Sequence, residues 1–269
     1  MTTSGAHYDA SYGNFRTRLY EEIRREAFGE DIGQQSWITA DEQDRFIQWL
    51  NLSAGRALLD VACGSGGPAL RIAGATGCAV MGIDLHEQAI AGARALAASR
   101  GLSDRARFEL ADARTRLPFP DLSFDAITCI DAINHLPDRA AVVREFMRVL
   151  RPGGRLLFTD PVVVTGALTS VEIASRSSIG FFLFVPIGYD DRVITDCGLR
   201  QLRCEDTTDH MAAISRRRGA ARAARRASLV EIEGEATYQA QQEFFDIVAR
   251  LGDERRLSRF VYVAERPTA

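Results

Sequence analysis

The stretch Leu58-Leu-Asp-Val-Ala-Cys-Gly-Ser-Gly-Gly67 decides the fold of this chain. It begins as a short apolar run, which is typical of a buried strand, and its glycines lead into an apolar helical pattern. Glycine lets the backbone turn sharply and approach a ligand closely. Taken alone, the segment Gly64–Ala69 also fits the dinucleotide fingerprint G-x-G-x-x-G/A, so this motif leaves a nicotinamide cofactor open.

Strand-like and helical patterns alternate on both sides of this stretch. The expected strands lie at 56–61, 79–83, 107–110, 124–130, 155–159, 199–205 and 257–264. The expected helices lie at 15–27, 40–50, 68–75, 87–100, 139–150 and 190–197, with a longer helical stretch at 210–251. Helix 40–50 begins with the capping-box pattern Thr39-Ala-Asp-Glu42. Short apolar strands separated by helices predict a parallel sheet that is covered on both faces.

The order of these elements predicts four regions. We expect an N-terminal helical lid at 1–51, a cofactor-binding core at 52–164, a cap insertion at 165–187, and a C-terminal part of the core at 188–269 that carries a helical insertion at about 208–252. Ligands of open α/β sheets bind at the carboxyl ends of the strands. The lid and the insertions are therefore expected to cover that edge of the sheet.

Composition and charge exclude several classes of protein. The chain has 269 residues, of which 46% are hydrophobic and 26% charged, and a net charge of -3, which gives no general attraction to nucleic acid or to an anionic membrane. The N-terminus lacks the pattern of a secretory signal, and the apolar run 179–187 is far short of a membrane span. Five cysteines without C-x-x-C spacing predict neither a disulfide framework nor a zinc site. A cytoplasmic protein is expected, and a homodimer stays open.

Three carboxylates follow three successive expected strands. Asp60 would repel a pyrophosphate but suits the ammonium group of a ligand. Asp84 can accept hydrogen bonds from ribose hydroxyls. Asp112 can accept from an adenine amino group while the N–H of Ala113 serves a ring nitrogen. Each aspartate alone is also explained as a helix N-cap, but three at successive strand ends favour a ligand site.

These residues, with the turn Leu150-Arg-Pro-Gly-Gly154, resemble the class I S-adenosylmethionine-dependent methyltransferases in order and spacing. The resemblance is close over about residues 35–160 and looser elsewhere. Ala62 stands where the family most often has glycine, a mild change. The resemblance implies an α/β, Rossmann-like seven-stranded sheet with the last strand antiparallel, and S-adenosyl-L-methionine as cofactor, with no metal. The implied cofactor-binding residues are Trp37, Asp60, Ala62, Cys63, Gly64, Gly66, Asp84, Leu85, Asp112, Ala113 and Ile130.

The segment Asp131-Ala-Ile-Asn-His135-Leu-Pro-Asp-Arg139 is expected to carry the chemistry. It is similar to the D-A-x-x-H-x-x-D-R run of glycine, sarcosine and dimethylglycine N-methyltransferases and to the E-x-x-H-H-x-P-D-R run of certain sugar O-methyltransferases of the ubiquinone-biosynthesis-like group. The resemblance implies that His135 removes a proton from an acceptor hydroxyl and that Asp160 orients it. The alternatives are that His135 caps the next helix and that Asp160 bonds only the backbone before Pro161.

Three further segments are open to two interpretations each. The segment Gly29–Trp37 resembles the lead-in of the same N-methyltransferases, so Trp37 packs on the cofactor or the substrate, or else forms a hydrophobic staple. The phenylalanines of 179–187 line an apolar acceptor pocket or only pack the cap on the core. The six arginines within 216–226 favour a solvated, salt-bridged helix, with a diphosphate or carboxylate acceptor bound by one of them as the alternative.

The predicted function is methyl transfer to an oxygen or nitrogen of a small-molecule metabolite, as in natural product biosynthesis, with His135 as general base. Three alternatives stay open: a C-methyltransferase of an apolar natural product, a cofactor-binding cyclase or regulator that does not methylate, and a nicotinamide dehydrogenase. Neither nucleic acid nor a membrane is expected as a partner.

Overall fold

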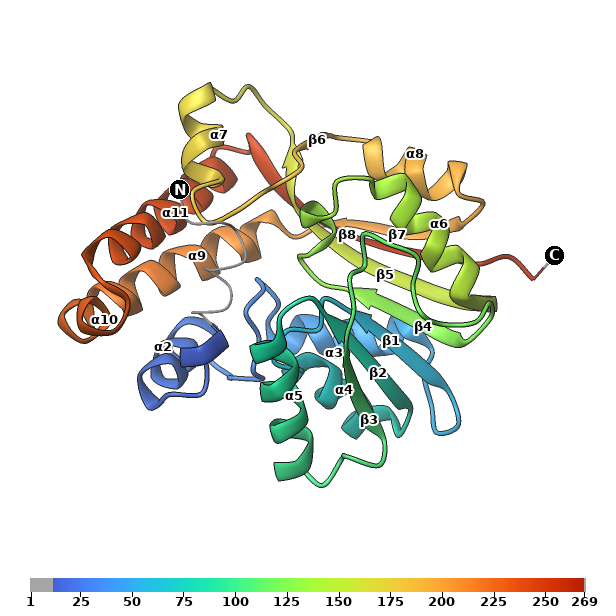
Figure 1. The fold of residues 1–269 in the computed structure, drawn as a ribbon. Helices are drawn as coiled ribbons and strands as arrows, with labels where there is room; N and C mark the ends of the chain where they lie inside the picture. Colours follow the sequence, from blue (N-terminus) through green and yellow to red (C-terminus); the bar gives the residue numbers. More distant parts are fainter. Residues whose placement is uncertain (1–11, 269) are drawn as a thin grey trace.

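The computed structural model describes residues 12–268 and consists of a sheet with helices on both faces and a helical layer beyond one end of its strands (Figure 1). The strands are β1 (Ala57–Val61), β2 (Ala79–Asp84), β3 (Ala106–Leu110), β4 (Phe124–Cys129), β5 (Leu150–Val164), β6 (Val185–Pro186), β7 (Arg200–Asp206) and β8 (Leu257–Glu265). Their order is β3-β2-β1-β4-β5-β8-β7, and β6 pairs with β5 off this path. Strand β8 is antiparallel to both of its neighbours, while β1 to β5 are parallel. The Rossmann-like α/β fold with an antiparallel last strand is thus confirmed, and the eighth strand is the two-residue β6 of the cap.

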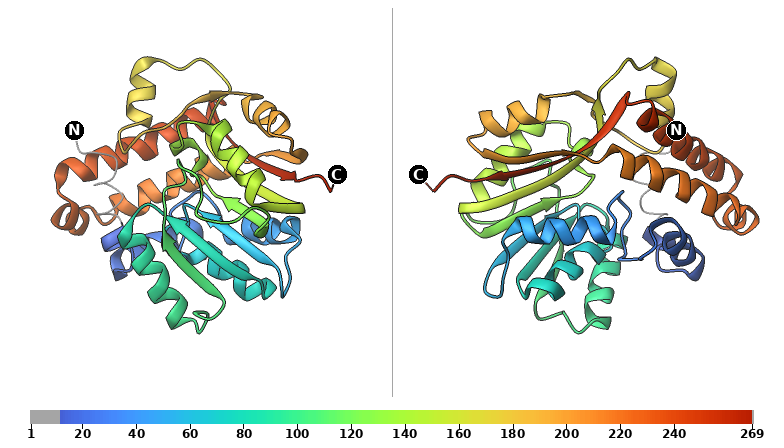
Figure 2. Two further views of the ribbon diagram at one scale, coloured as in Figure 1. Left: turned by 45° about the vertical axis from the view of Figure 1, so that its right-hand side comes forward. Right: turned by 180° about the vertical axis from the view of Figure 1, so that it is seen from behind.

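The helices that cover the sheet pack on its two faces (Figure 2). They are α3 (Ala40–Leu50), α4 (Gly67–Thr76) and α5 (Glu87–Ser99) on one face, and α6 (Arg139–Val149) and α8 (Tyr189–Asp196) on the other. Successive side chains of a strand point to opposite faces. In β1, Leu58 joins the apolar cluster under α3 to α5, whereas Leu59 joins the cluster under α6 and α8. Both leucines are fully buried, as a parallel sheet covered on both faces requires.

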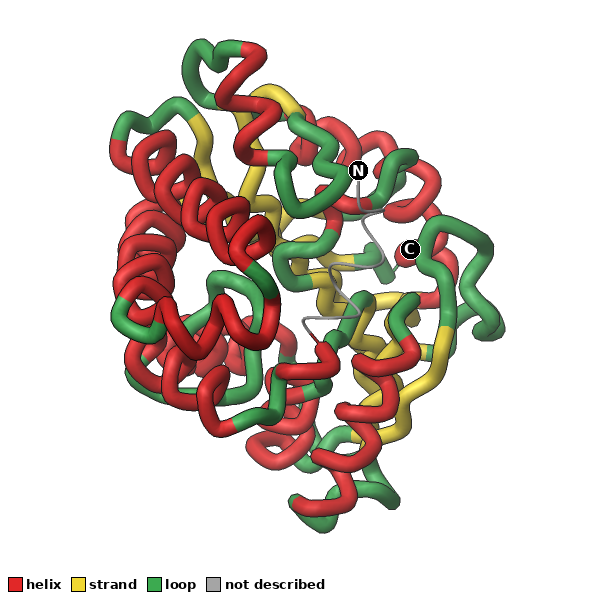
Figure 3. Tube along the Cα trace, turned by 60° about the vertical axis from the view of Figure 1, so that its left-hand side comes forward, coloured by secondary structure: helices red, strands yellow, loops and turns green. Residues whose placement is uncertain are grey.

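The remaining helices form the layer beyond the sheet (Figure 3). They are α2 (Arg18–Phe28), α7 (Ser170–Arg176), α9 (Thr208–Ala223), α10 (Arg226–Glu233) and α11 (Glu235–Asp253). Helix α9 packs against both α2 and α11. The helical stretch expected at 210–251 is therefore three helices, and Gly234, with φ of 80°, separates the last two.

Two helix starts differ from the expectations. Helix α7, which the sequence did not predict, begins with a complete capping box between Thr169 and Glu172. At α3 only half of the predicted box forms: the Thr39 hydroxyl accepts the Glu42 N–H at 3.2 Å, but the Glu42 carboxylate binds Arg259 instead. Glu42 is thus committed to a buried ion pair with the last strand.

The length and polarity of the helices bear on the membrane question. Within residues 12–268, none of the helices has a long enough apolar stretch to cross a bilayer.

Candidate cofactor and acceptor site

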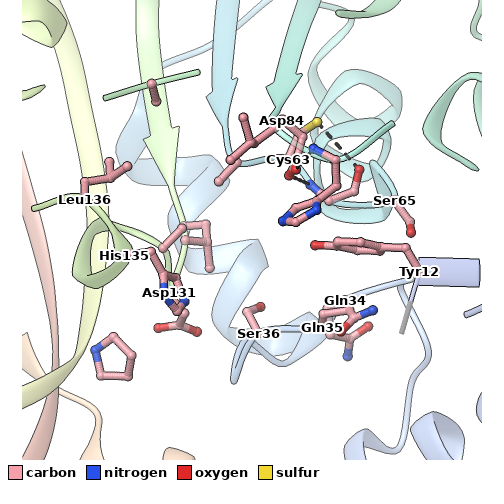
Figure 4. A pocket seen from close by; sticks show the side chains of 18 of the residues that line it. Tyr12, Gln34, Gln35, Ser36, Cys63, Ser65, Asp84, Asp131, His135 and Leu136 are labelled. Carbon is pink, nitrogen blue, oxygen red and sulfur yellow. Dashed lines mark hydrogen bonds between the residues drawn. The ribbon is translucent and has the colours of Figure 1, made fainter. Parts of the chain in front are cut away.

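A cavity of about 500 Å³ opens at the carboxyl ends of β1, β2 and β4, under the lid and the cap (Figure 4). Cys63 and Asp84 lie on one side of it, and His135 and Asp131 lie on the other. Every residue that the sequence predicts to bind the cofactor lines this cavity, except Gly66. The predicted cofactor residues and His135 therefore share one site.

Gly66 and Gly67, at the end of the loop after β1, are each required for a different structural reason. Gly66, the N-cap of α4, has φ of 76°, and a Cβ on it would lie 2.9 Å from both Ala93 and Phe108. Gly66 thus serves packing against α5 and β3, not the cavity wall. A Cβ on Gly67 would lie 2.1 Å from the carbonyl oxygen of Ile32, because the lid backbone rests directly on this loop.

Ala62 adopts the left-handed conformation, with φ of 56°. This conformation costs an L-residue about 1–2 kcal/mol relative to the right-handed region, whereas glycine adopts it freely. The alanine, expected to be a mild departure from the family, therefore stores backbone strain beside the cavity.

Asp60 and Asp84 are buried carboxylates on the cavity wall. Asp60 accepts a hydrogen bond from the Thr128 hydroxyl at 2.6 Å. Burial raises the pKa of Asp60 to about 7, the nearby Asp84 charge adds to this, and the Thr128 hydrogen bond opposes it. Asp84 accepts the N–H of Gly64 at 2.9 Å and that of His86 at 3.0 Å, so it also fixes the glycine loop. A buried acid with a raised pKa fits a cationic ligand, since the cation would stabilise its ionised form.

Asp112 lines the same cavity but is already engaged by Arg114. The Arg114 side chain donates to both of its carboxylate oxygens, which lowers the pKa of Asp112. A nucleobase amino group would share this carboxylate with Arg114. Cys63 also lines the cavity, and burial raises the pKa of its thiol, which keeps it neutral.

His135 lines the cavity, at the end of a 3₁₀ turn at Ile133–His135. Its Nδ1 lies 2.8 Å from the Phe181 carbonyl oxygen, and its ring lies 4.7 Å from that of Phe182. A carbonyl only accepts hydrogen bonds, so Nδ1 carries the hydrogen and Nε2 is the basic nitrogen of the neutral ring. Burial lowers the pKa of His135 to about 4, and the Arg176 charge adds to this, while the Phe181 hydrogen bond and the Asp131 charge oppose it.

Asp160 does not pair with His135, so the predicted orienting role is wrong. Its side chain is fully buried and binds Arg139 at 2.5 Å and the N–H of Val162 at 3.0 Å. The same Arg139 nitrogen binds Asp190 at 2.7 Å. Burial raises the pKa of Asp190 to about 7, and the neighbouring Asp160 charge adds to this. Arg139 draws Asp160 into this structural cluster because a buried guanidinium requires anionic partners.

A buried ion cluster that the sequence did not reveal lies at the floor of the cavity. Asp131, which lines the cavity, accepts from the Nε of Arg259 at 2.7 Å and from the N–H of Trp37 at 2.8 Å. Arg259 also binds Glu42 at 2.7 Å, and its side chain is fully buried. Its signal in the sequence is an arginine inside the apolar strand Leu257–Ala264. The cluster thus joins β8, the end of β4, α3 and the lid.

Aromatic side chains form part of the cavity wall. The Trp37 ring stacks on Phe244 at 6.1 Å and meets the edge of Phe245 at 6.3 Å. Phe182 stacks on Phe244 at 6.3 Å, and all four rings line the cavity. Trp37 and the cap phenylalanine Phe182 therefore pack the cap and line the cavity at the same time.

A Rossmann-like sheet with these carboxylates and glycines at its carboxyl edge is the arrangement of the class I S-adenosylmethionine-dependent methyltransferases. A model of the methyltransferase domain matches residues 59–158. The chain is 33% identical over 210 residues to the 27-O-demethylrifamycin SV methyltransferase of Amycolatopsis mediterranei. The aligned region covers 77% of this chain and 76% of that protein. The chain therefore belongs to the S-adenosylmethionine-dependent methyltransferases, whose cofactor is S-adenosylmethionine.

Two further similarities bear on the acceptor. The methyltransferase GfsG of Streptomyces halstedii is 46% identical over 172 residues, which are 63% of this chain and 61% of that protein. The chain thus spans somewhat less than two thirds of this relative's length. The [4+2]-cyclase SpnF has the same fold with a TM-score of 0.78 at 25% identity, over 99% of this chain and 98% of that one. Relatives of the family include O-, N- and C-methyltransferases, so membership leaves the methylated atom open.

Proposed function

We propose that this enzyme transfers the methyl group of S-adenosylmethionine to a hydroxyl oxygen of an apolar small molecule, with His135 as general base. The observation that carries the proposal is the position of the His135 imidazole on the wall of the cavity that the predicted cofactor residues line, with its Nδ1 at the Phe181 carbonyl oxygen. The similarity to the 27-O-demethylrifamycin SV methyltransferase over three quarters of both chains supports an oxygen acceptor on a natural product.

The cofactor supplies a methyl group bound to a positively charged sulfur. Asp60 and Asp84 would bind its ammonium and ribose hydroxyls, and Asp112 with the N–H of Ala113 would bind its adenine. Trp37 and Phe182 would exclude water from the acceptor side, and holding the acceptor oxygen in line with the methyl group provides much of the acceleration.

His135 acts as the base in this proposal through its Nε2 atom. A pKa of about 4 leaves the ring neutral at pH 7, so it is ready to accept a proton. A hydroxyl oxygen becomes strongly acidic as it gains the methyl group. A weak base therefore suffices, provided that it lies within hydrogen-bond reach of the hydroxyl when the bond forms.

The proposal is tested with a cofactor that carries a deuterated methyl group. The purified enzyme is incubated with a panel of hydroxylated macrolides and ansamycins that includes 27-O-demethylrifamycin SV, beside the same compounds with the hydroxyl already methylated. We expect the label as a methyl ether on the free hydroxyls only, located by mass spectrometry and NMR. Label on nitrogen or carbon would overturn the oxygen assignment. Bound cofactor that no acceptor consumes would favour a non-methylating enzyme, as the likeness to SpnF allows.

Asp60 predicts a pH-dependent affinity for the cofactor. Its pKa is raised to about 7, so the carboxyl is neutral below that pH and ionised above it. An ammonium favours the ionised form, so binding releases a proton below pH 7. We expect the affinity for S-adenosylhomocysteine to rise by up to about tenfold per pH unit between pH 5.5 and 7 and to level off above.

Calorimetry at several pH values, in buffers of different ionisation enthalpy, measures both the affinity and the released proton. In the Asp60→Asn variant the affinity should be lower at pH 7.5 and its slope below pH 7 should disappear. A wild-type affinity that is flat between pH 5.5 and 7.5 would contradict an ammonium site at Asp60.

A further inference from the structure

The charges on the cavity wall are divided between its two halves. Among residues 12–268, four carboxylates line the cavity, and all lie at the ends of strands or in the segments just after them: Asp60, Asp84, Asp112 and Asp131. On the side of the cap, the part of the wall that the described residues form carries the arginines Arg176 of α7 and Arg218 of α9. Arg114, whose side chain binds Asp112, also lines the cavity. Asp60, Asp84 and Asp112 thus belong to the half that suits the cationic cofactor, whereas Asp131, which binds Arg259, lies on the side of His135 (Figure 4).

Arg176 is a buried cation one ring away from His135. Its residue is 1% exposed, and its guanidinium carbon lies 4.2 Å from the centre of the Phe182 ring and 4.7 Å from that of Phe244. The Phe182 ring lies 4.7 Å from the His135 ring. A positive charge in such surroundings acts over a longer range than at the surface, because little water screens it.

Arg218 lies against Phe245, the residue of α11 that follows Phe244. Its guanidinium carbon lies 4.8 Å from the Phe245 ring and 5.6 Å from the Trp37 ring. Its Nη1 donates to the Gln35 carbonyl of the lid at 3.0 Å. Arg176 and Arg218 therefore flank the consecutive rings of Phe244 and Phe245. A guanidinium stacked on a ring keeps its N–H groups at its rim, in the fork that a carboxylate matches.

We propose that the acceptor is a hydroxy acid, whose apolar, ring-bearing body lies on the aromatic wall and whose carboxylate binds Arg176 and Arg218. This inference rests on the proposed function, because it takes the cap side of the cavity as the acceptor site. Rings of the acceptor contact the parts of Phe182 and Phe244 that line the cavity. The carboxylate fixes the orientation of the acceptor, and its hydroxyl then lies at His135.

The acceptor's own charge also strengthens the base. The Arg176 charge is one of the causes that lower the pKa of His135. A carboxylate bound at Arg176 offsets that charge, so the pKa of His135 rises toward its ordinary value when the acceptor binds. The enzyme thereby gains a stronger base only when an acidic acceptor is present.

The test compares two small probes that share a naphthyl body and differ in their end group, a carboxylate in one and an uncharged hydroxymethyl group in the other. Calorimetry measures the binding of 2-naphthylacetate and of 2-(2-naphthyl)ethanol to the full chain in saturating S-adenosylhomocysteine at pH 7.5. We expect the acid to bind about tenfold or more tightly than the alcohol, since a hydrogen bond to a charged partner contributes that much. Equal affinities of the acid and the alcohol would overturn the proposal.

Variants of the two arginines test whether they cause the preference for the acid over the alcohol. Arg176→Met and Arg218→Met should each weaken the acid by about tenfold and leave the alcohol within about twofold. Arg217→Met is the matched control, because Arg217 is exposed, adjacent in α9 and absent from the cavity wall, and both affinities should stay unchanged. An acid preference that both variants retain would also overturn the proposal.

Loss of folding in a variant is distinguished from loss of probe binding by two further measurements. The affinity for S-adenosylhomocysteine and the melting temperature report whether each variant is folded. If Arg176→Met does not fold, Arg176→Lys, which keeps the charge but loses the planar fork, and Arg218→Met decide the matter. These are binding measurements, so label found on nitrogen in the methylation assay would overturn the oxygen assignment without altering this result.

Discussion

His135→Ala is expected to lower turnover by about two to four orders of magnitude, the range that a positioned general base provides. The variant removes an imidazole that lines the cavity on the side proposed to hold the acceptor. The carboxylates proposed to bind the cofactor belong to β1, β2 and the segment after β3, so the affinity for S-adenosylhomocysteine should stay within about threefold. Turnover and affinity therefore separate in this variant.

Single-turnover kinetics with an accepted hydroxyl substrate measure the effect. Added imidazole should restore part of the rate in the alanine variant, which loss of a merely structural ring would not allow. His210→Ala is the control, because His210 is exposed and lies outside the cavity wall. Because the pKa of His135 is about 4 before the acceptor binds, His135 itself should cause no loss of kcat/KM for the acceptor between pH 8 and 5.5 at saturating cofactor. Turnover of His135→Ala within about threefold of wild type would refute the base assignment.

Arg259→Met is expected to lower the free energy of unfolding by about 3–5 kcal/mol, because removal of one member of a buried ion cluster leaves the others without compensation. The Arg259, Asp131 and Glu42 side chains are each at most 4% exposed. Without the guanidinium, two carboxylates remain buried in the same region. The cost therefore comes from stranded charge and not from lost packing, since methionine fills a similar volume.

Urea unfolding at pH 7.5 measures this difference. Arg45→Met is the matched control: Arg45 pairs with Glu205 at 3.0 Å, but its side chain is 42% exposed, and loss of a surface pair costs at most about 1 kcal/mol. Adding Glu42→Gln to Arg259→Met should recover part of the loss, because it removes one stranded charge. A loss no larger than that of the control would show that the cluster contributes little.

The sheet could be predicted from the sequence because its central strands β1 and β4 are short, buried and largely apolar, and because helical patterns separate most of the strands. All seven expected strands are present, and helix α3 has the predicted bounds Ala40–Leu50. The cap was less predictable. Helix α7 has only seven residues, too few for a periodic pattern, and β6 has two residues whose pairing with β5 is a tertiary contact.

In the candidate site, too, some residues could be placed from the sequence and others could not. The residues near the glycine loop could be placed because each follows a strand directly, and parallel strands end at one edge. The partners of Asp160 could not, because Arg139 and Asp190 reach it from two other elements. Asp131 and Arg259 are 128 positions apart, and local sequence does not encode a pairing of that separation. At Ala62 the structure explains a pattern in the sequence: the turn requires a positive φ at this position, and this requirement is what makes glycine common there.

The position of β8 late in the chain has a consequence for folding during synthesis on the ribosome. Within residues 12–268, β7 joins the sheet only through β8, and β8 also carries Arg259, the counter-ion of the cavity floor. On the ribosome, β7 and the three helices that follow it emerge before the strand to which they dock has been made. The acid at the floor of the cavity likewise remains uncompensated until then. Synthesis proceeds from the N-terminus, so the complete cavity, with its acid at the floor compensated, should form only once this late strand has left the exit tunnel.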